Sequence, residues 1–497
     1  NQFTPQTIEE CGRRGIKAAI IATSGFREVG ADGAMLEQKC LDVARQHGVR
    51  LLGPNCIGTL DTHLPLDTTF LQPPMPTQGG IGFISHSGAF AAAIIDWARE
   101  QGFGFSQIVS LGNQADVNET DMLPEVAKDE HTRVIALYME SVSDGKKFVQ
   151  AASEVTKYKP VIALKVGRFE AGQKAAASHT GALAGAEAAF DAAFAKAGVL
   201  RAETAEQLFD WARALETCPL PSGKHMAILT NAGGPGVIAA DSLETNGLVL
   251  SQLAKPTLEA LSSYLPPSAS THNPVDMLAS ASPENYATCL QLLLQDENVD
   301  GVLVILPPPP MFKAEEVAEK IIEVIGSFDK PVVIALMGST NVEKARSLFT
   351  SSRVPTYPFP ERAASSLGVL ARRAEYLDHV DDGRLTTDHI GHRQSSVTND
   401  IDDLLTSYGI PTVSIKLARD ENEAVSIANT LGFPLVMKIA SPDILHKSDV
   451  GGVILNIKDT ASLKSAYSKI IERVEKLIPP PQIDGVHLQR MIPAGQE

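Results

Sequence analysis

Residues 81–103 read IGFISHSGAFAAAIIDWAREQGF, an apolar strand that passes through small residues directly into a helix. Residues 226–248, MAILTNAGGPGVIAADSLETNGL, repeat this pattern at a shift of 145, which matches Gly88 with Gly233, Asp96 with Asp241 and Gly102 with Gly247. Further along, KPVIALKVG (159–167) matches KPVVIALMG (330–338). The simple inference is two copies of one nucleotide-binding-like fold, and chance resemblance between two βαβ units is the alternative.

The turn between strand and helix suits an anion in both copies. Free backbone N–H groups and the positive end of a helix dipole meet there, and glycine lets an anion approach the backbone closely. One such turn is common in α/β proteins. Two in duplicate domains predict two helix N-termini that converge on one phosphate, at Ser85-His86-Ser87-Gly88 and at Thr230-Asn231-Ala232-Gly233-Gly234.

Short apolar strands alternate with amphipathic helices along the chain. This alternation predicts α/β domains with parallel, doubly wound sheets. The strands are expected at IKAAIIAT, VRLLGPN, GGIGFIS, SQIVSLG, VIALYME, KPVIALKVG, HMAILTN, DGVLVILP and KPVVIALMG. Proline-rich or polar breaks fall at 73–76, at 219–223 and over about 376–396, and the last is the best candidate for a linker.

The composition excludes several classes of function. A chain of 497 residues with 43 Lys+Arg and 59 Asp+Glu carries a net charge of −16, which argues against a general nucleic-acid or anionic-membrane binder. The five cysteines are scattered, odd in number and free of CxxC spacing, which is typical of a reduced cytosolic protein without a zinc site. No run of 18 apolar residues is present. Both ends look cut, so some site residues are expected outside the chain.

A single histidine, His179, stands among small residues in AAASHTGALAG (175–185). The segment fits a helix start capped by Ser178 or Thr180, with His179 incidental. It also fits a glycine-hinged loop that exposes the imidazole on more than one side, as a phosphate acceptor would need. The residues of this segment alone leave both interpretations open.

The motifs together resemble the ADP-forming (NDP-forming) acyl-CoA synthetases, the acetate–CoA ligase group, which are related to succinyl-CoA synthetase. The resemblance rests on SGFREVG (24–30), LLGPNCIG (51–58), GFISHSGAF (82–90), SLGNQADVNETDML (110–123), KVGRFEAGQKAAASHTGALAG (165–185), AGVLRAETAEQLFDWA (197–212), NAGGPGV (231–237), HNPVDM (272–277) and GFPLVMKIASPDILHKSDVGGVILNI (432–457).

The resemblance implies a multidomain α/β architecture. Residues 1–75 would be the C-terminal half of a Rossmann-like CoA-binding domain. Two flavodoxin-like succinyl-CoA-ligase domains would follow at 76–218 and 225–372. A linker at 373–396 would lead to the N-terminal part of an ATP-grasp domain at 397–497.

By resemblance, His179 is the phosphohistidine and Glu140 is the carboxylate that orients it. A carboxylate on one ring nitrogen fixes the tautomer and leaves the other nitrogen nucleophilic. Without the resemblance, Glu140 would be read as a solvated strand end. The same resemblance assigns phosphate binding to Ser87, Gly88, Asn231, Gly233 and Gly234.

In the C-terminal segment the resemblance implies a second phosphorylated histidine, His446, which relays the phosphoryl group between His179 and ADP. The alternative for His446 is a phosphate clamp. A lysine within the apolar run LVMKIAS needs a partner, since a buried unpaired ammonium is costly. The implied nucleotide-binding residues are Lys438, Lys447, Gly451, Gly452, Gln489 and Met491. The Mg²⁺ ligands are expected beyond Glu497.

The implied contacts with CoA are Ser24, Gly25, Phe26, Pro54 and Asn55. The glycine-rich first turn of that domain is expected before Asn1. Cys56 is interpreted as a packing residue, because the chemistry runs through phosphate and histidine. The remaining histidines are interpreted as surface residues.

The predicted function is an ADP-forming acyl-CoA synthetase that acts through acyl phosphate and phosphohistidine. CoA, ADP or ATP, phosphate and Mg²⁺ would be its ligands, and a cytoplasmic homodimer of fused α–β chains its form. No motif specifies the acyl group. The alternatives are an acyl-CoA-sensing region of a protein-lysine acetyltransferase and a non-enzymatic scaffold.

Overall fold

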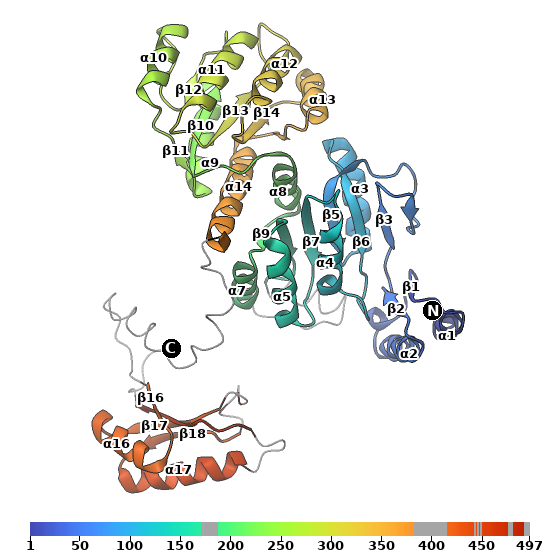
Figure 1. Ribbon diagram of the computed structural model, residues 1–497, viewed down its shortest axis with the longest axis vertical. Helices are drawn as coiled ribbons and strands as arrows, with labels where there is room; N and C mark the ends of the chain where they lie inside the picture. The colour runs from blue at the N-terminus through green and yellow to red at the C-terminus, as the bar shows by residue number, and fades with distance from the viewer. Residues whose placement is uncertain are drawn as a thin grey trace. The chain divides into compact units, whose positions relative to one another are not determined.

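The computed structural model describes residues 1–169, 172, 187–381, 415–441, 444, 447, 450–475 and 481–491 (Figure 1). The chain divides into two compact units, Asn1–Leu385 and Thr386–Glu497. Each strand predicted from an apolar run is confirmed within the first unit, and the ligase-type sheets are largely parallel as expected. None of the described helices is both long and apolar enough to cross a membrane.

The amino-terminal part of the first unit is a small two-stranded parallel sheet covered by two helices. Its elements are α1 (Thr4–Arg13), β1 (Ala18–Ile20), the 3₁₀ turn η1 (Arg27–Val29), α2 (Ala31–His47) and β2 (Arg50–Leu52). Its apolar core includes Ile8, Phe26, Leu41 and Leu51. Residues 113–117 of the next domain run along β2, where Val117 N donates to Leu51 O at 3.1 Å. This pairing fastens the two domains together.

The first sheet domain follows. Its sheet order is β4-β3-β6-β5-β7-β8-β9, parallel from β6 to β9 and antiparallel at β3 and β4. Its elements are β3 (Thr59–Asp61), β4 (Leu66–Asp67), β5 (Gln78–Ser85), α3 (Gly88–Gln101), β6 (Phe105–Ser110), α4 (Glu119–Lys128), β7 (Val134–Met139), α5 (Gly145–Thr156), β8 (Val161–Lys165), α7 (Glu187–Ala197), β9 (Leu200–Ala202) and α8 (Ala205–Thr217).

Helices cover both faces of this sheet, as the near-continuous apolar strands require. One buried cluster joins α3 and α8 to the sheet, and another joins α4, α5 and α7 to its opposite face. Local signals place the helix ends. Ser87 caps α3, Gly102 ends it with φ +71°, and Asn118 with Asp121 forms a capping box on α4.

The second sheet domain repeats this arrangement. Its order β11-β10-β13-β14-β15 matches β6-β5-β7-β8-β9 strand for strand. Its elements are β10 (His225–Thr230), α9 (Gly233–Thr245), β11 (Val249–Leu250), α10 (Lys255–Tyr264), β12 (Val275–Asp276), α11 (Pro283–Gln295), β13 (Gly301–Leu306), α12 (Ala314–Ile325), β14 (Val332–Leu336), the 3₁₀ turn η2 (Thr340–Val342), α13 (Glu343–Ser351), β15 (Thr356–Tyr357) and α14 (Pro360–Asp381). The internal repeat inferred from the sequence is therefore present in the fold.

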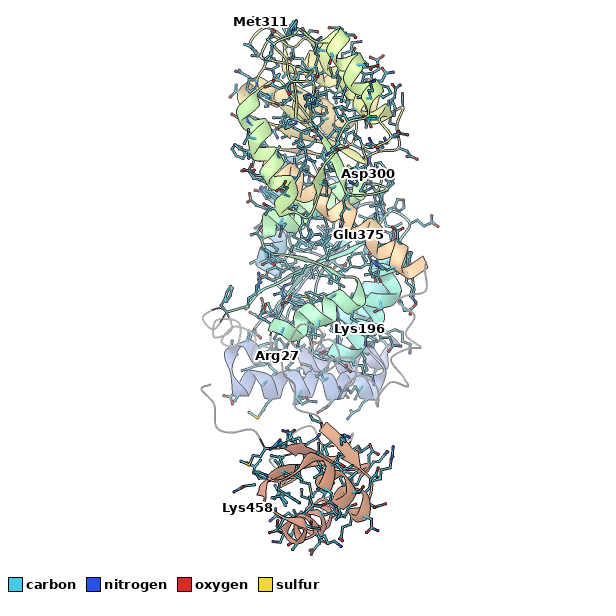
Figure 2. All side chains as sticks on the ribbon, turned by 90° about the vertical axis from the view of Figure 1, so that its left-hand side faces the viewer. Arg27, Lys196, Asp300, Met311, Glu375 and Lys458 are labelled. Carbon is cyan, nitrogen blue, oxygen red and sulfur yellow. The ribbon has the colours of Figure 1, made fainter. Side chains whose placement is uncertain are left out.

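Helices α8 and α14 join the two sheet domains. The Arg362 guanidinium binds the Asp210 carboxylate through two nitrogens, at 2.6 and 2.9 Å. Trp211 Nε1 donates to Ser365 Oγ at 2.9 Å. Burial raises the pKa of Asp210 although Arg362 opposes the rise. At the far end of α14, Glu375, labelled in Figure 2, pairs with Lys224 at 2.5 Å.

Two predicted boundaries need correction. The CoA-binding part was expected to extend to residue 75, but β3 and β4 pair into the sheet of the first sheet domain. The linker was expected to begin at 373, but α14 continues to Asp381 and Arg373, only 3% exposed, donates to Thr156 O at 2.5 Å. β3 and β4 belong to the first sheet domain because they pair with its sheet, and α14 runs on because its side chains bind Thr156; both contacts are distant in sequence and leave no trace in the local pattern. Residues 382–396 lie outside the described part.

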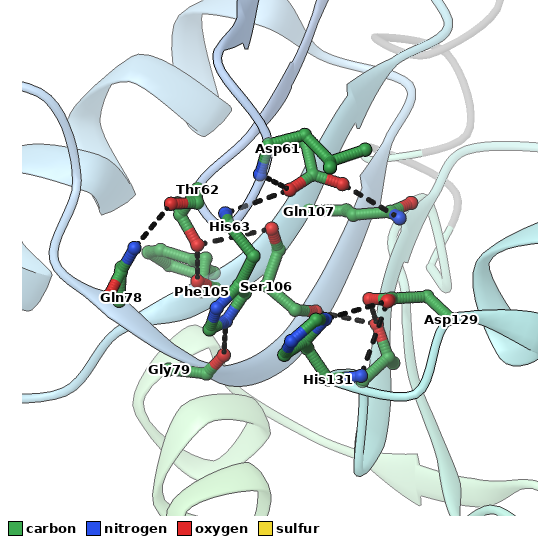
Figure 3. Close-up of polar contacts among 12 residues, drawn as sticks. Asp61, Thr62, His63, Gln78, Gly79, Phe105, Ser106, Gln107, Asp129 and His131 are labelled. Carbon is green, nitrogen blue, oxygen red and sulfur yellow. Dashed lines mark hydrogen bonds and ion pairs between the residues drawn. The ribbon is translucent and has the colours of Figure 1, made fainter.

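Figure 3 shows how the segment after β3 is held at the amino-terminal end of the first sheet. Asp61 Oδ1 accepts from the backbone N–H groups of His63 and Leu64, both at 2.8 Å. The His63 ring binds Gly79 O at 3.1 Å and stacks on His131 with ring centroids 3.9 Å apart. These residues lie at the edge opposite to the turns that follow the strands, so this histidine pair belongs to the scaffold.

The second unit contains a four-stranded antiparallel sheet of order β16-β19-β17-β18 with two helices. Its elements are β16 (Ile415–Ala418), α16 (Glu421–Leu431), β17 (Leu435–Ala440), β18 (Val453–Ile457), α17 (Thr460–Glu475) and β19 (Gly485–Arg490). Both helices pack on the sheet through one buried apolar cluster.

Candidate active site

The two predicted phosphate turns are built alike. Ser85 Oγ donates to Ser87 O at 2.8 Å and accepts from Ser87 N at 3.2 Å. Thr230 Oγ1 makes the same pair of bonds with Ala232, both at 3.0 Å. The repeat therefore extends to individual hydrogen bonds, and a hydroxyl at the last residue of β5 and of β10 shapes each turn.

The glycines at the starts of α3 and α9 differ in how much free space surrounds them. A Cβ on Gly88 would lie 2.8 Å from Ile57 Cγ2, so any larger residue there would force the Ile57 side chain to move. A Cβ on Gly233 would approach Asp276 Oδ2 at 3.3 Å, whereas one on Gly234 would meet nothing within 4 Å. Gly233 and Gly234 are exposed. No hydrogen bond or ion pair of the described residues joins the two turns, so their convergence on one phosphate stays a prediction.

Glu140 follows β7, beside the first turn. Its backbone N–H donates to His86 Nδ1 at 3.1 Å. His86 Nε2 lies 3.3 Å from Glu119 Oε2, and both side chains are buried. The expectation that the remaining histidines lie at the surface is wrong for His86, which is 7% exposed. Sequence reasoning missed both His86 and Glu119, although a histidine within the phosphate turn was a signal that could have been followed.

A buried lysine stands near the same edge of the sheet. Lys165, at the end of β8, is 1% exposed, and its ammonium lies 4.7 Å from the Phe190 ring centroid. Its Nζ donates to Val166 O at 2.5 Å. Burial lowers the pKa of Lys165, while the charges of Glu187 and Glu140 oppose that shift. The apolar run KPVIALKVG carries no signal that its lysine would be buried.

His179 lies outside the described residues. The described residues on either side of residues 173–186 are held together by ion pairs. Arg168 Nε lies 3.3 Å from Glu187 Oε2, and Arg201 binds the same carboxylate oxygen. Arg201 also contacts Asp191. Arg168, which follows β8, and Arg201 of β9 therefore both bind the first turns of α7.

The predicted CoA loops are organised by acidic side chains. Glu28 Oε1 accepts from the backbone N–H groups of Gly25 at 2.5 Å and Phe26 at 3.2 Å. Burial opposes but does not cancel the effect of the hydrogen bonds from Asn113, Gly25 and Phe26, which lower the pKa of Glu28. Phe26 is fully buried in the core, and its backbone N–H is already donated to Glu28. Ser24 is exposed.

Asn113 connects these loops to the first sheet domain. Its Nδ2 donates to Glu28 Oε2 at 2.6 Å and to Glu37 Oε2 at 2.9 Å. Its Oδ1 accepts from Asn55 Nδ2 at 3.3 Å, and its backbone N–H donates to Pro54 O at 2.8 Å. Arg27, labelled in Figure 2, donates to Asn113 O. Sequence reasoning missed this hub, because its partners lie far away along the chain.

Cys56 matches its predicted packing role. It is 2% exposed, and burial raises the pKa of its thiol. Its Sγ contacts Ile21 O at 3.5 Å. A protonated, enclosed thiol is a poor nucleophile.

In the second unit, three predicted nucleotide-binding positions lie near one another. Lys438 Nζ donates to Gln489 Oε1 at 3.0 Å. His487 lies directly opposite Lys438 in the β17–β19 pairing. Its pKa is lowered by burial and then by the charges of Lys447 and Lys438. His487 is half-buried, so it was also wrongly taken for a surface residue. The cluster carries the positive charge that phosphates require.

The glycines after Lys447 have structural reasons to be glycine. Gly451 has φ +65°, and a Cβ on Gly452 would lie 2.6 Å from Ile439 Cγ2. Gly452 N donates to Lys447 O at 2.8 Å, and Met491 N donates to Pro434 O at 2.9 Å. His446, Ser448 and Asp449 lie outside the described residues.

Comparison with known proteins matches each part of the chain to a domain model. These are a CoA binding domain at residues 1–62, a succinyl-CoA ligase like flavodoxin domain at 78–215, a Ligase-CoA domain at 226–378 and an ATP-grasp domain at 391–497. Together with the two matched turns at the helix starts, they define a CoA ligase that combines two flavodoxin-like ligase domains with an ATP-grasp domain.

Full-length relatives narrow this class. The chain is 39% identical to the acetate–CoA ligase [ADP-forming] I of Archaeoglobus fulgidus and 35% identical to the 4-hydroxybutyrate–CoA ligase [ADP-forming] of Nitrosopumilus maritimus, in each case over 100% of this chain and 73% of the relative. A solved acetyl-coenzyme A synthetase 1 of Ca. Korarchaeum cryptofilum, in complex with phosphate and ADP, superimposes with a TM-score of 0.72 at 35% identity, over 77% of this chain and 82% of that chain. The chain belongs to the ADP-forming acyl-CoA synthetase family.

Proposed function

We propose that this chain interconverts acyl-CoA, ADP and phosphate with a carboxylic acid, CoA and ATP. The observation that carries the proposal is the pair of matched helix-start turns, one of which lies beside Glu140. Each turn presents N–H groups at a helix start, where negative charge is stabilised. Family membership and the four matched domain models supply the same conclusion from the sequence.

The reaction proceeds in three steps. Phosphate attacks the thioester carbonyl, the C–S bond breaks, CoA leaves as the thiol and acyl phosphate forms. A ring nitrogen of His179 attacks phosphorus, and the carboxylate leaves. The phosphoryl group then passes to the terminal oxygen of ADP. Division into phosphoenzyme steps lets separate CoA and nucleotide sites share one intermediate.

Each group of residues has one task in this scheme. Ser87, Gly88, Asn231, Gly233 and Gly234 hold the phosphate, and the Glu140 carboxylate holds one ring nitrogen of His179. The loops that contain Ser24, Gly25, Phe26, Pro54 and Asn55 receive CoA. The nucleotide lies against Lys438, Lys447, Gly451, Gly452, Gln489 and Met491.

Labelling tests the proposal directly. Incubation of the protein with ATP labelled at the γ-phosphate should give acid-labile, base-stable label on protein, and His179→Ala should abolish both that label and net ATP formation. His225→Ala removes an exposed histidine at the start of β10 and serves as the matched control with full label. Full turnover of His179→Ala would overturn the proposal. Absence of label on the native protein would favour an acyl-CoA sensor instead.

Within the proposed function, His446 acts as a relay. A histidine beside Lys447 adds little as a mere clamp that the lysine does not already provide. With His446→Ala, acyl-CoA plus phosphate should still label His179, whereas ATP should not. Efficient labelling of His179 from ATP in that variant would reassign His446 to phosphate binding.

The proposal also includes Mg²⁺ with the nucleotide, a homodimer of fused α–β chains and a cytoplasmic location, which the five unpaired cysteines support. Within the described part of the chain, no group of three or more His, Cys, Asp or Glu side chains could hold a metal ion. These residues do not form a Mg²⁺ site, and no step is assigned to the metal.

A further inference from the structure

A buried three-residue connection links α4, the first phosphate turn and Glu140. Glu140 N donates to His86 Nδ1 at 3.1 Å, and His86 Nε2 faces Glu119 Oε2 at 3.3 Å. The side chains of His86 and Glu119 are 3% and 1% exposed. Among the described residues, neither the Glu119 oxygens nor His86 Nε2 takes part in a hydrogen bond, so the two side chains face each other only as a close buried pair. A buried carboxylate without a hydrogen-bond donor is costly, so this arrangement needs a reason other than stability.

The hydrogen bond from Glu140 determines the state of the imidazole. His86 Nδ1 accepts a hydrogen bond from the backbone N–H of Glu140, so Nδ1 carries no proton itself. The proton of the neutral ring is therefore on Nε2, the nitrogen that faces Glu119. The Glu119 carboxylate lies 3.3 Å from this nitrogen, where its negative charge favours a proton on Nε2, as a carboxylate behind a histidine does at many sites. As a result, Nδ1 stays available to the Glu140 N–H.

The second copy of the fold provides an internal comparison. The two turns match at Ser85 and Thr230, so His86 corresponds to Asn231. The strand registers pair Ile81 with Val134 and Met226 with Gly301, which makes Pro307 the counterpart of Glu140.

Proline has no N–H to donate. Accordingly Asn231 Oδ1, which is buried, has no hydrogen-bond partner among the described residues. The bond from the strand end to the turn is thus not a general requirement of this fold. It occurs in the copy that carries Glu140.

We propose that His86 is a positioning residue for phosphoryl transfer, which holds the Glu140 segment against the phosphate turn, and that Glu119 fixes the His86 tautomer. The inference rests on the proposed function of Glu140 and His179. His86 lies between Ser85 and Ser87, so it connects the position of the phosphate to that of the carboxylate that orients His179. Correct relative placement of such groups strongly affects the rate of a transfer step.

Three His86 variants separate the proposed bond from simple packing. In His86→Asn, the amide oxygen takes the place of Nδ1 and can accept from Glu140 N, whereas in His86→Gln the amide takes the place of Nε2. His86→Leu keeps the volume and removes both nitrogens. We expect His86→Leu and His86→Gln to slow His179 phosphorylation by acyl phosphate at least tenfold in single-turnover experiments, and His86→Asn to recover most of the rate.

Controls distinguish positioning from a general loss of structure. His63→Leu removes a hydrogen-bonded histidine from the same domain at the opposite sheet edge (Figure 3) and should leave the transfer rate unchanged. CoA affinity and melting temperature are measured for all variants. Glu119→Met should slow transfer like His86→Leu, whereas Glu119→Gln, which keeps a carbonyl oxygen facing Nε2, should be milder.

The double variant of His86→Leu with Glu140→Gln tests whether His86 affects the transfer rate through Glu140. If His86 acts through Glu140, the double variant should be little slower than Glu140→Gln alone. A wild-type rate for His86→Leu, or equal recovery by Asn and Gln, would overturn this inference while Glu140→Gln remains slow. A wild-type rate for both Glu140→Gln and His179→Ala would instead overturn the proposed function.

Discussion

Replacement of Asn113 by aspartate changes one atom of a buried hub from donor to acceptor. The Asn113 amide nitrogen donates to Glu28 Oε2 at 2.6 Å and to Glu37 Oε2 at 2.9 Å. Glu28 in turn accepts from the backbone of Gly25 and Phe26 in the proposed CoA loop. Asn113→Asp therefore places a third carboxylate against two existing ones, and Asn113→Ala only removes the donor.

The magnitudes follow from these contacts. Each hydrogen bond to a carboxylate contributes about 1.5–3 kcal/mol. Asn113→Ala removes two, so the free energy of opening the loop at residues 24–30 should fall by about 3 kcal/mol or more. In Asn113→Asp, repulsion between carboxylates about 3 Å apart adds to this loss. The repulsion cannot exceed the cost of protonating one of the carboxylates. At pH 7.5 this upper limit is roughly 5 kcal/mol for an ordinary carboxyl pKa near 4. At pH 5.5 the same limit falls to about 2 kcal/mol.

The native protein and Asn113→Asp should differ in how the stability of this loop depends on pH. Because the folded pKa of Glu28 is below its ordinary value of 4.5, its stabilisation is fully present above that value and is lost only as pH falls through the folded pKa. The native loop should therefore be equally stable at pH 7.5 and 5.5. The Asn113→Asp loop should become more stable on acidification, because its crowded carboxyls gain a proton more easily.

Amide hydrogen exchange of residues 24–30, corrected for the intrinsic rate at each pH, measures this opening. A loss of 3 kcal/mol corresponds to about a hundredfold faster exchange. At pH 7.5 we expect exchange to be slowest in the native protein, faster in Asn113→Ala and fastest in Asn113→Asp. At pH 5.5 the exchange rates of the two variants should converge. CoA affinity should be highest in the native protein and lowest in Asn113→Asp. An aspartate variant as protected as the alanine variant at pH 7.5 would refute the role of the Asn113 amide as the shared donor.

Two further predictions concern Cys56 and His487. Cys56→Ala should retain steady-state turnover within about threefold, because a buried thiol with a raised pKa does not act as a nucleophile; a hundredfold loss would assign it a chemical role. The pKa of His487, lowered by burial and by Lys447 and Lys438, should rise when ADP binds, because phosphate charge opposes that of the lysines. An NMR titration of the imidazole with and without ADP measures the shift, and an unchanged pKa would place the nucleotide elsewhere.

Much of the fold could be predicted from local patterns. Apolar runs bounded by small residues gave the strands, since a strand buried on both faces reads as a continuous hydrophobic segment. The match between residues 81–103 and 226–248 predicted duplicate domains, and the structure repeats the turn bonds of Ser85 at Thr230. Boundaries were less predictable. The linker does not begin at 373, because Arg373 and Tyr376 are held by Thr156, far away in the sequence.

The sequence by itself determined the duplicated α/β design and the two small-residue turns at the helix starts, because each depends on residues that are neighbours along the chain. Only the tertiary structure decided which polar groups support them. The parallel pairing of β5 with β7 brings His86 to the N–H of Glu140, and the docking of residues 113–117 on β2 brings Asn113 to Glu28 and Glu37. These contacts join residues tens of positions apart, and a hydrogen bond depends on separation in space, which strand order and register set.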